Sequence, residues 1–218
     1  MNVQQIIDGL VFYLGLVVLL TFHEYGHAWV AWKCGDDTAR RRGRLSLNPI
    51  VHLDLIGTVA VPLLMIYLAA TGSTMGRFLV GWAKPVPVDS NNLRHPKRDD
   101  ILVSMAGPAV NVILALLLLP LAKAALMMDL NYFGTTLAEM AYFSLLLCFF
   151  NLLPVPPLDG SHVLRVVTGM SYQTYGRIAS FGFIILIILL QIPLVRNLII
   201  LPARATFLFI KTLLHLQG

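Results

Sequence analysis

The sequence predicts an all-α polytopic membrane protein with about five to six transmembrane helices. Hydrophobic residues make up 57% of the 218-residue chain and charged residues only 12%, whereas about a quarter of a soluble domain is charged. Several apolar runs also approach the roughly 20 residues that cross a bilayer. Too little polar surface remains to coat a globule, so the composition excludes a soluble protein with buried core helices.

Charge and cysteine content narrow the class of protein further. The formal net charge is +5, and in a membrane protein basic loops set the orientation and contact anionic lipid. We therefore expect the lipid bilayer as a partner, and no nucleic acid. The two cysteines, Cys34 and Cys148, are too few and too far apart to indicate a disulfide framework.

The chain shows no sign of a second unit. No polar stretch is long enough for an extra soluble domain, so residues 1–218 are predicted to form a single domain. The first ten residues, MNVQQIIDGL, lack the basic region and the small-residue cleavage site of a signal peptide. We interpret them as the start of the mature protein.

The first predicted span covers about 9–32, and basic residues follow it closely. No lysine or arginine precedes this group, which comprises Lys33, Arg40, Arg41, Arg42 and Arg44. Cytoplasmic loops carry an excess of Lys and Arg, so the N-terminus is expected outside the cell and this loop inside. The next apolar run, 55–70, is short and contains Pro62. It is predicted to be a tilted span or one arm of a hairpin.

The segment 76–88 is predicted to be re-entrant or β-like. Its second half, GWAKPVPV, alternates in character and holds two prolines, which suits an edge strand better than a span. The stretch 84–100 is again basic and is expected in the cytoplasm, with Lys84, Arg94, Lys97 and Arg98. An even number of crossings, or a re-entrant excursion, must therefore separate the two basic loops.

The second half of the chain contains three further predicted spans, at about 101–122, 135–154 and 178–195. The first of these runs outward and the second returns inward. The last apolar stretch, 197–216, is interrupted by Pro202, Arg204 and Lys211. It is predicted to be either a sixth span or a helix lying at the membrane surface.

Ionisable side chains occur inside the first span, in TFHEYGHAW. His23 and His27 are four residues apart and share a helix face, so both can bind one metal ion. Glu24 lies roughly 100° away around the helix. It is free to accept a proton from water instead of binding the metal. Ionisable groups in a span are costly and indicate function, and a chance match is rare because the chain has only two glutamates.

A catalytic zinc site needs a third protein ligand and an open position. Asp159 is the predicted ligand because it follows a proline-rich break, NLLPVPPLDG, at the inner end of the fourth span. His27 is expected at the same side of the membrane. His162 and His52 are weaker candidates. His52 and Asp54 are interpreted mainly as a polar pair in a loop or at the start of a helix, and a role near the metal is the second interpretation.

HEYGH, NLLPVPPLDG and AGPAVN (106–111) together resemble the site-2 protease family of intramembrane zinc metalloproteases, in particular its compact bacterial members without PDZ or CBS domains. The similarity extends over about 10–165. It implies cleavage of a transmembrane protein substrate near the cytoplasmic face of the cell membrane. It also implies one Zn²⁺ per chain with Glu24 as general base, a polar group near the site at Asn151, and three ligands: His23, His27 and Asp159.

Two alternatives remain at this stage. Asn111 follows Gly107 by four residues in the third span, which favours close helix packing first and a role in the site second.

The same metal residues could also serve a non-proteolytic zinc-binding membrane scaffold or a transporter. A transporter would show more polar residues in several spans, and an inactive scaffold would have lost Glu24 or a ligand. The sequence carries no indication of the oligomeric state.

Overall fold

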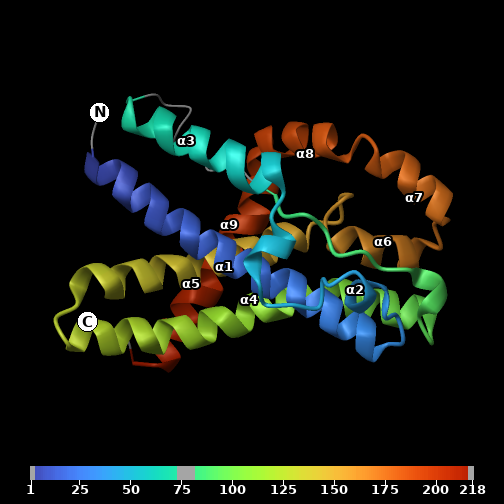
Figure 1. Cartoon of the computed structure of the whole chain (residues 1–218), viewed down its shortest axis with the longest axis horizontal. Helices are drawn as coiled ribbons and strands as arrows, with labels where there is room; N and C mark the ends of the chain where they lie inside the picture. The colour runs from blue at the N-terminus through green and yellow to red at the C-terminus, as the bar shows by residue number, and fades with distance from the viewer. Residues whose placement is uncertain (1–2, 73–81, 216–218) are drawn as a thin grey trace.

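The computed structural model describes residues 3–72 and 82–215. Within these ranges the chain is helical and contains no β-strand, which confirms the predicted all-α class. Figure 1 shows that the longest helices run roughly along the long axis of the molecule. The start of α1 lies at one end and α2 (Thr38–Arg41) lies toward the other.

Four helices are long and apolar enough to cross a membrane: α1 (Val3–Lys33), α4 (Pro96–Met127), α5 (Asn131–Asn151) and α9 (Pro193–Leu213). A fifth span is possible if α7 (Tyr172–Ala179) and α8 (Gly182–Gln191), which meet at a bend of 61°, cross together. The described residues therefore form a multi-pass membrane protein with four or five candidate spans. The larger of these two numbers, five spans, agrees with the predicted five to six transmembrane helices.

The predicted second span is shorter than a full crossing. Leu55–Ala60 forms a π-helix that continues into α3 (Val61–Ala70), and the combined helix is too short to count as a candidate span. Asp54 caps its start, because Oδ1 accepts hydrogen bonds from two backbone N–H groups at 3.1 and 2.7 Å. The interpretation of Asp54 as a helix-start residue is therefore confirmed.

The last apolar stretch is one helix, α9, which continues through Pro202. It crosses α5 obliquely (Figure 1), and its length and composition fit a span. Its packing joins it to α4 and α5 in one buried cluster, formed by Ala115, Leu119, Ala141, Leu145, Ala203 and Ile210. Half of these residues are alanines, and small side chains let helices approach closely within a membrane.

The segment 82–88 is neither helix nor strand, and residues 73–81 of the predicted re-entrant or β-like stretch lie outside the described residues. The backbone N–H of Trp82 donates to the Gly57 carbonyl at 3.2 Å, and that of Lys84 donates to the His52 carbonyl at 3.0 Å. The backbone N–H groups of alternate residues thus point toward the rest of the protein, and this two-residue period is that of an extended chain. The segment is β-like in this sense, but it pairs with loops and helix ends instead of a strand.

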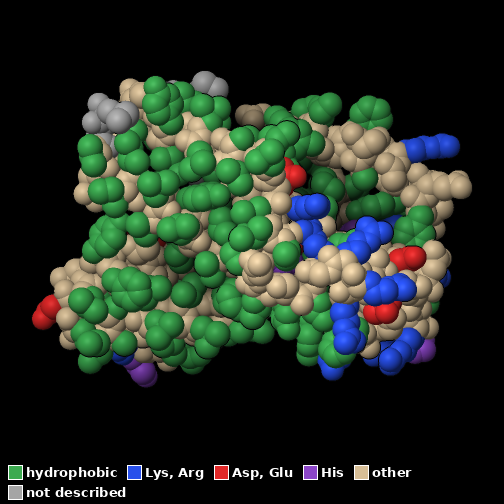
Figure 2. Space-filling view, in the orientation of Figure 1, with side chains coloured by type: hydrophobic (Ala, Val, Ile, Leu, Met, Phe, Trp, Pro, Cys, Tyr) green, Lys and Arg blue, Asp and Glu red, His purple; other side chains and the backbone are tan. Residues whose placement is uncertain are grey.

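Basic side chains gather at one end of the molecule. Figure 2 shows them around α2 and the neighbouring loops, whereas hydrophobic side chains are spread over much of the remaining visible surface. The exposed arginines and lysines of α2 and these loops include Arg40, Arg41, Arg42 and Lys97. A surface of this kind suits a body enclosed by lipid with one charged end in water.

Candidate metal centre

Two histidines of α1 face the interior of the helix bundle. His23 and His27 are only 4% and 8% exposed, and their Nε2 atoms lie 3.1 Å apart. Because the two residues are separated by about one helical turn, both rings leave the same face of α1. The shared face predicted from their spacing is present.

The chain turns sharply before Asp159. After α5 ends at Asn151, residues 152–159 form turns without a regular helix, and α6 (Gly160–Thr168) follows. A Cβ atom at Gly160 would collide with the backbone carbonyls of residues 152 and 153. The absence of a side chain at Gly160 thus allows a close backbone approach, where the chain folds Asp159 back toward the histidines.

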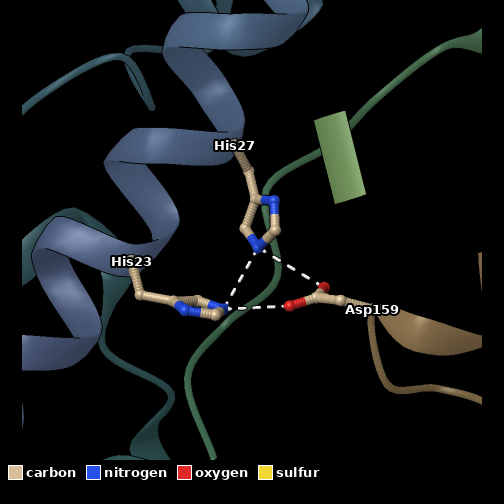
Figure 3. A group of neighbouring side chains, drawn as sticks. All are labelled: His23, His27 and Asp159. Carbon is tan, nitrogen blue, oxygen red and sulfur yellow. Dashed lines mark hydrogen bonds and ion pairs between the residues drawn. The ribbon is translucent and has the colours of Figure 1, made fainter. Parts of the chain in front are cut away.

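The Asp159 carboxylate meets both rings. Its Oδ2 lies 3.3 Å from His23 Nε2, and its Oδ1 lies 3.4 Å from His27 Nε2. Figure 3 shows the carboxylate directed at these two nitrogens, with the histidines coming from one helix and the aspartate from a distant part of the chain. The potential ligand atoms of the three residues all lie within 4.8 Å of one another. Among the described residues, this is the one group with the composition and spacing of a metal site.

The helix α4 supports both rings. His27 Nδ1 lies 2.7 Å from the Val103 carbonyl oxygen, and His23 Nδ1 lies 3.1 Å from the side-chain amide of Asn111. These contacts occupy Nδ1 in each ring and leave Nε2 directed at Asp159. Gly107 lies between the two contacts, where a Cβ atom would collide with both rings. Glycine at this position is what allows α4 to pack so closely against the site.

The donor set fits a zinc ion. Two imidazole nitrogens and a carboxylate oxygen form an accepted catalytic set. Asp159 Oδ2 is buried and has no hydrogen bond of acceptable geometry, although it lies near His23 Nε2. Buried polar atoms normally have a partner, and a cation between the three side chains would provide one here.

Glu24 lies beside this cluster on α1 and is 9% exposed. Its Oε2 atom accepts a hydrogen bond of 3.0 Å from the backbone N–H of Val86. The segment 82–88 therefore passes directly beside Glu24. This contact orients a carboxylate that takes no part in the group of three ligands.

Arg44 holds the segment 82–88 in this position. It is 7% exposed, and its Nη2 donates to the carbonyl oxygens of Lys84 and Pro85 at 2.7 and 3.1 Å. Burial lowers the pKa of the Arg44 guanidinium from its ordinary value, while the Glu24 carboxylate acts in the opposite direction. Arginine keeps its charge under such conditions, so it remains a strong donor to the two carbonyls.

Asp36 fixes the following part of the chain. Its side chain is fully buried, and Oδ2 accepts a hydrogen bond of 2.8 Å from the backbone N–H of Asp89. Burial alone would raise the pKa of the Asp36 carboxyl. Hydrogen bonds from Thr38, Asn92 and the Asp89 backbone outweigh burial and hold this pKa below its ordinary value.

Three other candidates from the sequence contact groups other than the three ligands. His52 Nε2 lies 2.8 Å from a backbone carbonyl six residues earlier in its own loop. His162 Nδ1 lies 3.2 Å from Asp100 Oδ1. Asn151 Nδ2 donates to a carbonyl one turn earlier in α5, at 3.0 Å. A direct role of Asn151 in the site stays a prediction.

Comparison with known proteins identifies the class. The model of peptidase family M50 matches residues 11–128 and 121–190, and the chain belongs to this family. The site-2 protease resemblance seen in the sequence is thereby confirmed.

Individual relatives agree with the family. "Putative zinc metalloprotease YwhC" of Bacillus subtilis is 40% identical over 187 residues, which cover 82% of this chain and 79% of that protein. "Putative zinc metalloprotease Rip2" of Mycolicibacterium smegmatis is 32% identical over 184 residues, or 82% of this chain and 66% of the relative. The protein of the same name from Mycobacterium tuberculosis is 37% identical over 153 residues, which cover 69% of this chain and 54% of that protein. No solved structure matches the chain.

Proposed function

We propose that the protein is an intramembrane zinc metalloprotease that hydrolyses peptide bonds of transmembrane substrate proteins. The observation that carries this proposal is the convergence of His23, His27 and Asp159, with Glu24 beside them on the same apolar helix. Membership of a peptidase family supports the reaction class. The names of the relatives support zinc as the metal.

His23, His27 and Asp159 would hold one Zn²⁺ per chain. When bound, the ion polarises the scissile carbonyl and acidifies the attacking water. Glu24 accepts the proton of that water through its carboxylate and later delivers it to the leaving amine nitrogen. The Val86 N–H engages one oxygen of this carboxylate, and Arg44 holds the segment that carries Val86, so the other oxygen would be available to accept the proton.

Asn111 would set the tautomer of His23. A histidine that binds metal through Nε2 carries its proton on Nδ1 and needs an acceptor there. Asn111 Oδ1 is buried without a partner, and turning the amide by 180° would place this oxygen next to His23 Nδ1. The oxygen and nitrogen of an amide are assigned from such networks, so the donor and acceptor roles then agree with metal binding.

Reconstitution tests the proposed reaction. The purified protein in liposomes should cleave a co-reconstituted single-span protein, and 1,10-phenanthroline should stop the cleavage until zinc is added back. The chelator removes the ion on which the reaction depends. A panel of single-span proteins that all remain intact, together with zinc transport into the liposomes, would contradict a protease and favour a transporter.

We further propose that the N-terminus faces outward and that the loops 33–54 and 84–100 face the cytoplasm. The gathering of Lys and Arg at one end of the molecule supports this orientation (Figure 2). The metal centre then lies toward the cytoplasmic side, because His23 and His27 are in the second half of α1.

Cysteine labelling of whole cells tests the orientation in a background without Cys34 and Cys148. Lys97 and Tyr132 are both exposed. An impermeant maleimide should label Tyr132→Cys from outside and should label Lys97→Cys only after the membrane is opened. The reverse pattern would show that the chain is inserted the other way.

A further inference from the structure

A buried ion pair, with histidine and tyrosine side chains around it, connects α6 to α4 and α7. Arg165 Nη2 lies 2.7 Å from Asp100 Oδ2, and the two side chains are 8% and 5% exposed. His162 Nδ1 lies 3.2 Å from the other oxygen, Asp100 Oδ1. Both oxygens of this carboxylate are therefore engaged by residues of α6.

Arg165 is held from a second side by α7. Its Nη2 lies 3.0 Å from the Tyr172 hydroxyl, and its guanidinium carbon lies 3.8 Å from the centre of the Tyr172 ring. Ser161 of α6 is also within 2.9 Å of the Tyr175 hydroxyl. The network thus joins α4, α6 and α7 in one place, and α6 is its central member.

The short helix α6 depends on such contacts for its position. It has nine residues, and the turns of 152–159 separate it from α5, so no continuous helix fixes its direction. His162 and Arg165 are three residues apart and share one face of α6. Two contacts from one face to a single carboxylate fix both the place and the rotation of the helix.

Asp159 lies immediately before α6, and the position of its carboxylate follows from the position of this helix. The same helix α4 that carries Asp100 also contacts His27 through Val103 and His23 through Asn111. A single helix therefore orients all three proposed ligands. Misplacement of a reacting group by about 1 Å can cost about 100-fold in rate. A single helix that orients all three ligands would therefore keep their relative positions accurate.

We infer that Asp100 and Arg165 are positioning residues that hold α6 against α4 and thereby place the Asp159 carboxylate opposite the two histidines. This inference rests on the proposed zinc-binding function. Neither residue touches the ligand group itself, and the effect passes through the backbone of α6. His162 is a partner of Asp100 in this arrangement, which explains its place near the site without a role as ligand.

Zinc affinity is the measurement that tests this inference. Arg165→Met removes the charge but keeps a long side chain, and Asp100→Asn keeps the shape of the carboxylate. Both variants should weaken zinc binding by about 10–100-fold in a chelator competition, the usual effect of losing a partner that orients a ligand. The visible spectrum of the Co²⁺-loaded variants should also differ from that of the wild type, because it reports the geometry of the ligands. Arg165→Lys, which keeps the charge, should fall between wild type and Arg165→Met.

The control is Asp37→Asn, which removes an exposed pair with Arg41 at 2.9 Å. Its zinc affinity should stay within about twofold of wild type, since exposed pairs contribute little. If Arg165→Met is folded by circular dichroism and keeps both wild-type zinc affinity and the wild-type Co²⁺ spectrum, the inference is wrong while the proposed function stands. If Arg165→Met does not fold, Arg165→Lys decides by the same two measurements. A wild-type protein that binds no zinc would reject the proposed function and this inference together.

Discussion

Glu24→Gln should lower the cleavage rate by at least about 100-fold, the lower end of what a general acid–base contributes. Zinc should stay bound, because the three proposed ligands are unchanged. Glutamine has nearly the same volume, and its Oε1 can still accept the hydrogen bond from the Val86 N–H. The variant therefore isolates the loss of a proton acceptor. Cleavage of a reconstituted single-span protein and metal analysis of the same sample measure the two effects.

Glu139→Gln is the matched control, because Glu139 is the other glutamate in the chain. It lies exposed on α5, away from the three ligands, and the variant should cleave like the wild type. Full activity in a purified Glu24→Gln protein would reject Glu24 as the base. Loss of both zinc and activity would instead indicate that Glu24 helps to hold the metal.

The fold class and the three proposed ligands could be predicted because each leaves a local signal. The four-residue spacing of His23 and His27 within an apolar helix predicts that they share one face. The prolines before Asp159 and the glycine after it predict that this aspartate lies in a turn. The predicted topology puts both signals at the same side of the membrane, and the structure brings the three side chains together.

Of the contacts that surround these ligands, the sequence points only to Asn111, as a secondary candidate, and that residue contacts His23. Val86 contacts Glu24 through a backbone N–H, which no side-chain pattern reveals. Arg44 belongs to a basic run that is explained equally well by membrane orientation, and only the fold shows that it is buried against two carbonyls. Asp100 and Arg165 are 65 residues apart, and each looks like an ordinary charge next to a span.

Helix boundaries also differ from the sequence-based ones for physical reasons. The predicted span 101–122 is part of a helix that extends from Pro96 to Met127, because hydropathy marks only the part that lipid could surround, while the helix continues into polar surroundings. The predicted span 178–195 starts at the end of α7, continues past a 61° bend into α8, and ends in the first turn of α9. A bend of this kind depends on packing against neighbouring elements, which an apolar run does not record.

Asp159→Ala should lower both zinc content and cleavage, because it removes one of only three proposed protein ligands. The expected loss of zinc affinity exceeds about 100-fold, since even partners that merely orient a ligand cost 10–100-fold. His52→Ala should keep zinc and activity, as His52 contacts a carbonyl of its own loop and lies outside the cluster. His162→Ala should also keep zinc bound, because it leaves the Arg165–Asp100 pair in place. Metal analysis of the three purified variants measures these differences. Full zinc in Asp159→Ala, combined with its loss in either histidine variant, would show that the third ligand is a histidine and that the proposed geometry of the site is wrong.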